Sequence, residues 1–289
     1  MKSFVDQLIS AGIEKNEAKK EIFILESEIK DKEKIKKIVD ERIKKRTPIQ
    51  YLLGKAYFMD FEVKVNKKVL IPRPETEILV EEAVRRGVLQ YARTALDIGT
   101  GSGIIAIALA KAIPNVKITA IDIDKEIIDL ANENAKLNNV DEKINFQVCD
   151  IFSKCFEGLL QNPKFDLIIS NPPYIKEDED PRPHLQPEII HEPKIALSGS
   201  RENKTGLIYY ERIFSVIARK GKALTKQSHK CEIASGLKPL AMTKHCILAF
   251  EIDPPLVNNL KSLLKKNGFE NFEIVKDYAK LDRCLFVYA

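Results

Sequence analysis

Residues 97–103, Asp-Ile-Gly-Thr-Gly-Ser-Gly, form the strongest candidate for a ligand-binding segment in this 289-residue sequence. Glycines allow the backbone to turn tightly and to approach a ligand closely, because no Cβ stands in the way. The segment lies between a predicted strand and a predicted helix, and ligands of open α/β sheets bind at the carboxyl ends of strands. A glycine-rich loop alone is also compatible with an ordinary tight turn, so its neighbours decide the interpretation.

Two carboxylates follow this loop at the ends of the next two predicted strands. Asp122 lies about 20 residues further on, where an acid can accept hydrogen bonds from two ribose hydroxyls. Asp150 ends the third strand, where an acid or its neighbouring backbone can meet an adenine edge. Either residue could instead serve only as a helix cap or turn former. The three features at successive strand ends favour an adenosine-containing ligand.

The arrangement of the glycines distinguishes between two such ligands. In the dinucleotide fingerprint a third glycine follows the second by three positions, and here that position is Ile104. An acid, Asp97, also stands just before the first glycine, where it would attract a cation and repel a pyrophosphate. The pattern therefore favours S-adenosylmethionine, whose sulfonium is positive, over NAD. The sequence contains no GxxxxGK[ST] motif, which excludes a P-loop.

A second chemical segment, Asn171-Pro172-Pro173-Tyr174, follows an apolar predicted strand. Two prolines fix their φ angles and provide no N–H donors, so nearby carbonyls can hold fixed directions. The Asn171 side-chain carbonyl and the Pro172 backbone carbonyl would then accept the two hydrogens of a substrate NH2 group, while Tyr174 packs on its planar group. This orientation suits an in-line methyl transfer to a planar nitrogen, which depends on proximity more than on a strong base. The alternative is a simple proline turn.

The elements expected to position these segments alternate between strand and helix, which predicts a doubly wound parallel sheet of the α/β class. The predicted strands are 94–98, 116–121, 144–148, 165–169, 247–252, 272–276 and 284–288, and the predicted helices are 75–88, 103–112, 125–137, 206–218 and 255–267.

The N-terminal part has a different pattern and predicts a separate domain. Apolar residues at spacings of three and four indicate three short helices within residues 1–46, with most charges on solvated faces. Residues 47–76 form a connector, with a hairpin over 57–71 that turns near 66–68. The remaining residues, 77–289, form the main domain, in which 219–236 is expected to be an inserted surface loop.

Composition excludes several classes of protein. No apolar run reaches the roughly 18 residues of a membrane span. The net charge is +5, but residues 219–245 carry seven basic residues against one acid, so the rest of the chain is slightly acidic. A broadly basic nucleic-acid surface is therefore not expected. The five cysteines lack a CxxC pair, and we expect free thiols in a reducing cytosol.

Several further segments give the sequence a specific resemblance. It resembles the HemK/PrmC-type protein-(glutamine-N5) methyltransferases that act on peptide-chain release factors. The Asn-Pro-Pro-Tyr tetrapeptide alone is shared with adenine-N6 DNA methyltransferases, so the other segments carry the distinction. These segments are Thr-Pro-Ile-Gln-Tyr-Leu-Leu-Gly at 47–54, Leu-Ile-Pro-Arg-Pro-Glu-Thr-Glu at 70–77, Glu192-Pro193 and Ala196-Leu197.

The resemblance implies a class I, Rossmann-like methyltransferase with a small N-terminal helical domain for partner recognition, here shorter than is usual. It implies that Asn171, Pro172, Pro173 and Tyr174 hold the glutamine of a Gly-Gly-Gln loop. It also implies a cytoplasmic monomer without metal, stable nucleic acid or membrane attachment. The S-adenosylmethionine site would comprise Gly99, Thr100, Gly101, Ser102, Gly103, Asp122, Asp150, Ile151, Asn171 and Arg73, with Ile151 where relatives often have an aromatic residue.

Two alternatives remain open at this stage. An adenine-N6 nucleic-acid methyltransferase should show a base-recognition domain or a broad basic surface, and outside 219–245 this chain has a slight excess of acids. A catalytically silent binding module of the same fold should have lost its reactive segment, whereas Asn171, Pro172 and Tyr174 are intact.

Overall fold

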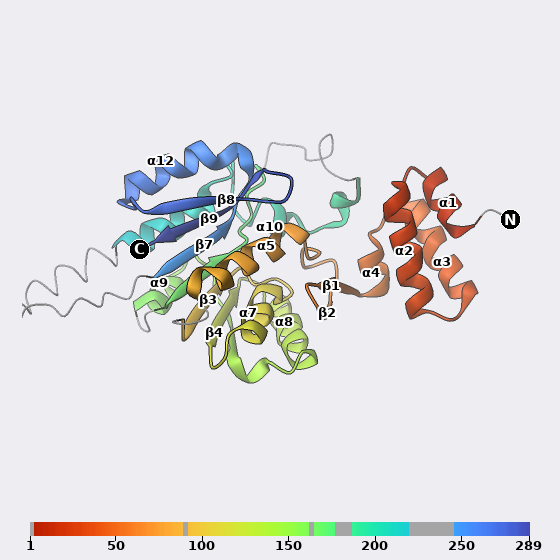
Figure 1. Ribbon diagram of the computed structural model, residues 1–289, viewed down its shortest axis with the longest axis horizontal. Coiled ribbons are helices and arrows are strands. Elements are labelled where there is room, and N and C mark those ends of the chain that lie inside the picture. Colours follow the sequence, from red (N-terminus) through yellow and green to blue (C-terminus); the bar gives the residue numbers. More distant parts are fainter. Residues whose placement is uncertain (1–2, 89–91, 162–164, 177–186, 220–245) are drawn as a thin grey trace, which may run out of the picture.

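The computed structural model describes residues 3–88, 92–161, 165–176, 187–219 and 246–289. Three N-terminal helices lie at one end of the molecule, apart from the sheet that forms the main body (Figure 1). They are α1 (Phe4–Ser10), α2 (Lys15–Glu28) and α3 (Lys32–Lys45), which confirms the three helices expected there. Side chains of Ser3, Glu14 and Asp31 accept hydrogen bonds from N–H groups of the first turns, and the apolar faces meet in a small core.

The connector differs from its prediction. After the short helix α4 (Ile49–Leu53), strands β1 (Lys55–Phe58) and β2 (Phe61–Lys64) form an antiparallel hairpin. The predicted turn near 66–68 is wrong, because the chain turns at Met59, which has a φ of 51°. Apolar alternation continues beyond β2 through the buried Val65 and Val69, but this stretch packs into the core as irregular chain. The alternation therefore extended the predicted hairpin too far.

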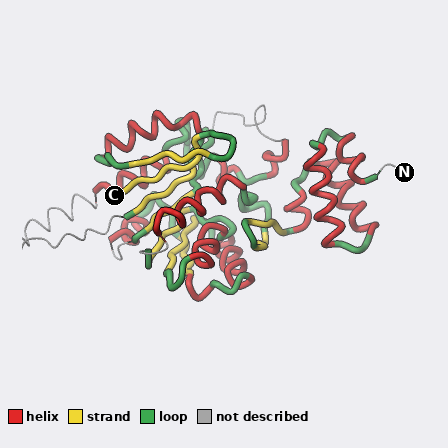
Figure 2. Tube along the Cα trace, viewed as in Figure 1, coloured by secondary structure: helices red, strands yellow, loops and turns green. Residues whose placement is uncertain are grey.

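The main domain is built on a seven-stranded sheet in the order β5-β4-β3-β6-β7-β9-β8, seen as the yellow layer in Figure 2. Pairing is parallel from β5 through β7 and antiparallel at β9 and β8, which confirms the predicted doubly wound sheet. The strands are β3 (Thr94–Ile98), β4 (Lys117–Asp122), β5 (Ile144–Val148), β6 (Leu167–Ser170), β7 (Ile247–Glu251), β8 (Phe272–Lys276) and β9 (Asp282–Tyr288).

Two apolar cores cover the sheet, one on each face. Alternate residues of β3, such as Ala95 and Leu96, belong to different cores, because successive side chains of a strand point to opposite faces. The first core includes α5 (Pro74–Ala83), α7 (Ile104–Ala112) and α8 (Lys125–Leu137), and the second includes α9 (Lys154–Gln161), the helical residues 208–219 and α12 (Val257–Asn267).

Short helical turns complete the described chain. They are the π-helix η1 (Val84–Val88), the 3-10 helices η2 (Asp141–Lys143), η3 (Pro187–His191) and η4 (Pro254–Leu256), and α10 (Lys194–Leu197). Of these, η2, η3 and α10, like α4 and α9, were not predicted. The predicted insertion lies outside the described residues except for position 219, which ends the described helical stretch.

Two further findings concern the expectations from composition. Within the described ranges, no helix is both long enough and apolar enough to cross a membrane. The expectation of free thiols is wrong for one pair, because Cys149 and Cys155 form a disulfide. The turn that begins at Asp150 brings their Cα atoms to 5.9 Å, a proximity that the spacing of six residues did not indicate.

Candidate active site

A pocket lies at the carboxyl ends of β3, β4 and β6, where the sequence placed its two chemical segments. It holds about 1050 Å³ of space continuous with solvent. Most of the predicted site residues line it together, and the two exceptions are Gly103 and Tyr174. The residues that the fold brings together are Arg73, Gly99, Thr100, Gly101, Ser102, Asp122, Asp150, Ile151, Asn171, Pro172 and Pro173.

The glycine loop joins β3 to α7 in a conformation that requires its glycines. Gly99, Gly101 and Gly103 have positive φ angles of 71°, 54° and 86°. Residues with a Cβ rarely adopt this left-handed backbone conformation. No atom lies within 4 Å of a Cβ built on Gly99 or Gly101, so the backbone there faces open space. At Gly103 a Cβ would lie 3.2 Å from the Cβ of Ala131 on α8, so this glycine permits close packing of a helix rather than contact with a ligand.

Asp122, at the end of β4, holds the glycine loop in place. Its Oδ2 accepts a hydrogen bond from the Gly101 N–H at 3.0 Å, and its Oδ1 accepts one from the Ile123 N–H at 2.8 Å. Burial raises the pKa of this carboxyl. The cap of α8 is Asp124, whose side chain accepts from the Glu126 N–H. Asp122 therefore does not serve as that helix cap.

Asp97 lies behind the glycine loop and is fully buried. Its Oδ2 accepts a hydrogen bond from the Thr100 hydroxyl at 2.7 Å, while its buried Oδ1 accepts none from the residues that the structure describes. Burial raises the pKa of Asp97 to about 7. A cation bound near Thr100, which lines the pocket, would favour the ionised form of this acid. The site thus contains a buried acid that forms no ion pair with the described residues.

The wall near Asp150 contains a residue that the sequence analysis missed. Asp150 Oδ1 accepts from the Phe152 N–H at 2.8 Å, and Arg201 lies 3.4 Å from its Oδ2. Ile151 lines the pocket as expected, and Tyr209 supplies an aromatic side chain there. The nearest signal in the sequence was Ala196-Leu197, which carried part of the family resemblance and precedes Tyr209 by 12 positions.

The Asn-Pro-Pro-Tyr segment follows β6 directly and presents two hydrogen-bond acceptors. Among the described residues, neither Asn171 Oδ1 nor the Pro172 carbonyl accepts a hydrogen bond, and both residues line the pocket. The Pro173 carbonyl, by contrast, accepts from Asn203 Nδ2 at 3.3 Å. Gly206 allows the backbone to pack closely against this segment, because a Cβ there would lie 2.6 Å from the Tyr174 carbonyl oxygen.

Tyr174 is the predicted residue whose position differs most from expectation. Its hydroxyl donates to Oε1 of Glu251 at 3.2 Å, so the polar end of the side chain is anchored in the protein interior. Burial raises the pKa of Tyr174 well above its usual range, so the phenol stays protonated at neutral pH. Glu251, at the end of β7, was missed even though it follows the same strand-end pattern that identified Asp122 and Asp150.

At the mouth of the pocket, Arg73 forms an ion pair with Glu192. Its Nη2 lies 2.5 Å from Glu192 Oε1, while the buried Glu192 Oε2 has no hydrogen-bond partner within the described ranges. Burial raises the pKa of the Glu192 carboxyl. Arg73 precedes α5, so this pair ties the connector to the segment that follows η3.

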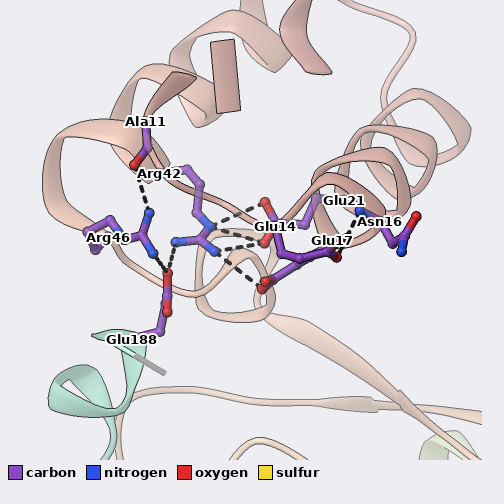
Figure 3. Close-up of polar contacts among 8 residues, drawn as sticks. All are labelled: Ala11, Glu14, Asn16, Glu17, Glu21, Arg42, Arg46 and Glu188. Atoms are coloured by element: carbon purple, nitrogen blue, oxygen red, sulfur yellow. Dashed lines mark hydrogen bonds and ion pairs between the residues drawn. The ribbon is translucent and has the colours of Figure 1, made fainter. Parts of the chain in front are cut away.

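A buried ion-pair cluster, which we call the domain joint, links the N-terminal helices to η3 (Figure 3). Arg42 on α3 is 1% exposed, and it contacts Glu21 on α2 at 3.0 Å and Glu188 on η3 at 2.7 Å. Arg46 lies 2.7 Å from the same Glu188 oxygen, and His191 Nε2 lies 2.7 Å from the Lys45 carbonyl oxygen. Arg42 and Glu21 are therefore exceptions to the expectation that most charges of residues 1–46 lie on solvated faces.

Comparison with known proteins agrees with this geometry. Residues 74–201 match the sequence profile of the family described as Methyltransferase small domain. The solved catalytic domain of hMettl16, in complex with a 3′UTR hairpin, superposes with a TM-score of 0.53 at 14% identity, covering 78% of this chain and 74% of that one. At this identity the likeness concerns the fold alone. The sheet order, the pocket and the profile define a methyltransferase of the Rossmann-like α/β class, as predicted.

Curated relatives narrow the class to one family. A protein of Chlorobaculum tepidum is 35% identical over 89% of this chain and 79% of its own length. A protein of Thermodesulfovibrio yellowstonii is 36% identical over 88% of this chain and 80% of its own length. Both are named release factor glutamine methyltransferase. This chain belongs to the release factor glutamine methyltransferase family, which confirms the resemblance found in the sequence.

Proposed function

We propose that this protein transfers a methyl group from S-adenosylmethionine to the side-chain nitrogen of a glutamine in peptide-chain release factors. The observation that carries the proposal is a pair of acceptors in the wall of one pocket, Asn171 Oδ1 and the Pro172 carbonyl, that accept no hydrogen bond from the described part of the chain. Two acceptors match the two hydrogens of a primary carboxamide. A carboxylate or an ester offers no hydrogens at that position, so the wall favours an amide.

The other wall of the pocket fits the cofactor. Backbone of Gly99 and Gly101 faces open space, and Asp122, Asp150 and Ile151 lie where a nucleoside would bind. Asp97 has a buried oxygen that accepts no hydrogen bond from the described residues and a pKa raised to about 7, which favours a positively charged ligand on the pocket side of Thr100. When bound, S-adenosylmethionine supplies an electrophilic methyl group on a sulfonium.

The residues of this chain then position the nitrogen rather than activate it strongly. Asn171 and Pro172 hold both N–H groups of the glutamine, which turns the nitrogen lone pair toward the methyl carbon. The nitrogen forms a bond to that carbon as the sulfur–carbon bond breaks, and it loses one proton to water afterwards. Tyr174 remains a neutral phenol and keeps the segment fixed through its bond to Glu251.

We extend the proposal to the partner and its location. The N-terminal helices would contribute to docking of the release factor, because the domain joint links them to η3, in the segment that follows Tyr174. The enzyme would act as a cytoplasmic monomer, where translation takes place, without a stable nucleic-acid partner.

The test is mass spectrometry of a purified release factor after incubation with this protein and S-adenosylmethionine. The wild type should add one methyl group to the glutamine of the Gly-Gly-Gln loop. Asn171→Ala should lower the rate by about 100-fold or more while the dissociation constant of the cofactor stays unchanged. Asn145→Ala, on the edge strand β5 and outside the pocket lining, is the matched control and should retain full activity. Unimpaired transfer by Asn171→Ala would refute the mechanism.

A further inference from the structure

Glu251 forms the buried end of a hydrogen-bonded chain that reaches Asn171. It is 1% exposed and ends β7, next to β6, where Ser170 pairs with Phe250. Its Oε2 accepts a hydrogen bond from the Thr76 hydroxyl at 2.6 Å, and Asn171 Nδ2 lies 3.1 Å from the same hydroxyl oxygen. Strand register and the start of α5 thus bring together three residues that are far apart in the sequence.

The direction of each hydrogen bond between Glu251, Thr76 and Asn171 follows from the carboxyl group of Glu251. Both carboxyl oxygens of Glu251 accept a hydrogen bond from a hydroxyl, Oε1 from Tyr174 and Oε2 from Thr76, so the single hydroxyl proton of Thr76 is committed to Glu251. The Thr76 oxygen can then only accept from Asn171, which must turn its NH2 group toward Thr76. Asn171 Oδ1 is consequently turned away from Thr76 and left without a protein donor among the described residues.

We propose that Glu251 is a positioning residue that sets the amide orientation of Asn171 through Thr76, and so makes the site select glutamine over glutamate. The inference rests on the proposed function. An acceptor at Asn171 Oδ1 attracts the NH2 group of glutamine and repels the oxygens of a glutamate carboxylate. Glu251 does not itself line the pocket, and it acts through Thr76, which does.

In the Glu251→Gln variant, the glutamine side chain would reverse the direction of the hydrogen bond between Thr76 and Asn171. Its amide could place either its oxygen or its NH2 group toward Thr76. With the oxygen toward Thr76, the NH2 group would face the Tyr174 hydroxyl and leave that buried hydroxyl proton without an acceptor. With the NH2 group toward Thr76, Tyr174 keeps its acceptor, and the Thr76 proton is released toward Asn171. The second arrangement satisfies every group, and it favours an Asn171 that presents NH2 to the pocket.

The central experiment compares the wild type with Glu251→Gln in two measurements. The first is kcat for release-factor methylation, which should fall about 10- to 100-fold in the variant, in the range seen for outer-shell orienting groups. The second is binding of a release factor whose Gly-Gly-Gln glutamine is replaced by glutamate. The wild type should bind the glutamine form more tightly, and Glu251→Gln should lose or invert this preference. The dissociation constant of S-adenosylmethionine should remain unchanged.

Control variants separate orientation from general loosening of the fold. Tyr210 donates a hydrogen bond from its hydroxyl to the Glu251 backbone carbonyl at 2.7 Å. Tyr210→Phe therefore removes a hydrogen bond to the same residue without changing the direction of the hydrogen bonds between Glu251, Thr76 and Asn171. It should keep the preference for glutamine. Thr76→Ser should also keep it, whereas Thr76→Val, which removes the hydroxyl, should lose it. The Thr76 pair decides the question if Glu251→Gln does not fold.

The outcomes distinguish this inference from the proposed function. An inactive wild type that shows no binding of release factor would refute the proposed function. An active wild type together with an equally active and equally selective Glu251→Gln would overturn the role of Glu251 alone. Equal losses in Tyr210→Phe and Glu251→Gln, with the preference for glutamine intact in both, would also overturn it, because they would show a purely structural contribution.

Discussion

The domain joint and the active site both bury carboxylates, but they neutralise them differently. In the joint, Glu21 and Glu188 each contact the guanidinium of Arg42, and Arg46 adds a second cation to Glu188. In the active site, Asp97 and Glu251 accept hydrogen bonds from hydroxyl groups, and the described residues provide neither of them with an ion pair. The carboxylates of the joint thus have basic partners within the protein, whereas Asp97 and Glu251 have none among the described residues.

This difference separates a structural role from a functional one. In the joint, burial raises the pKa of Glu21 and the guanidinium of Arg42 opposes this shift, and the cluster holds two parts of the chain together. A buried carboxylate without a cation has a raised pKa, as Asp97 and Glu251 both do through burial. Such groups are typical of sites where a ligand supplies the missing charge or where the direction of a hydrogen bond matters.

The largest expected effect is a loss of stability when the domain joint, like the active site, has buried carboxylates without their arginine. Arg42→Met would leave Glu21 and Glu188 buried without their shared cation. Removing one partner of a buried ion pair typically costs about 3 to 5 kcal/mol, so we expect a loss of that size in the free energy of unfolding. Urea denaturation followed by circular dichroism would measure it.

A triple variant provides the control for this prediction. Arg42→Met combined with Glu21→Gln and Glu188→Gln removes the fully buried charges together, and it should recover most of the lost stability because the groups that lose a partner, Arg46 and Glu17, are partly exposed to solvent. If the triple variant is as unstable as the single one, packing by the Arg42 side chain matters more than charge compensation, and the contrast with the active site disappears.

A smaller loss of stability is expected when only the ion pairs between the N-terminal helices and η3 are removed. Glu188→Gln removes the ion pairs to Arg42 and Arg46 but leaves the pair between Arg42 and Glu21 intact. We expect a loss of about 1 to 2 kcal/mol in the free energy of unfolding. If the joint positions the helices for docking, KM for the release factor should rise while cofactor affinity is unchanged.

The matched control for the link is Glu41→Gln. Glu41 pairs with Lys45 along the exposed side of α3 at 2.9 Å, so the change removes an ion pair of the same helix that does not reach η3. It should leave both stability and KM unaffected. An equal rise of KM in the two variants would show that the net charge of α3, rather than the link to η3, governs docking.

Periodicity and turn residues predicted most of the fold. Strands 144–148 and 272–276 and helix 125–137 agree with the structure residue by residue, because apolar spacing and flanking polar residues defined both ends. The hairpin was misplaced because Val65 and Val69 are buried without belonging to a strand. Short helices such as α9 and α10 were missed because they span only one or two turns.

The parts of the site that were predicted are those held by short segments. The glycine loop and the Asn-Pro-Pro-Tyr segment are each contiguous, and Asp122 follows a strand whose end could be located. Thr76 and Glu251 meet across 175 positions of sequence, and Arg42 and Glu188 meet across 146. Such contacts depend on strand order and on the packing of α3 against η3, neither of which local spacing determines.

The smallest effect tests whether the active site awaits a positive charge. Because the pKa of Asp97 is raised to about 7, this acid is mostly protonated at about pH 6 and mostly ionised at about pH 7.5. A cationic ligand favours the ionised form, so S-adenosylmethionine should bind about eightfold more tightly at the higher pH, where the ionised fraction is larger by that factor. Isothermal titration across this range would measure the change. Asp97→Asn should give a flat profile, since an amide does not titrate. A wild-type affinity that is independent of pH would show that Asp97 is compensated within the protein, in the same way as the carboxylates of the joint.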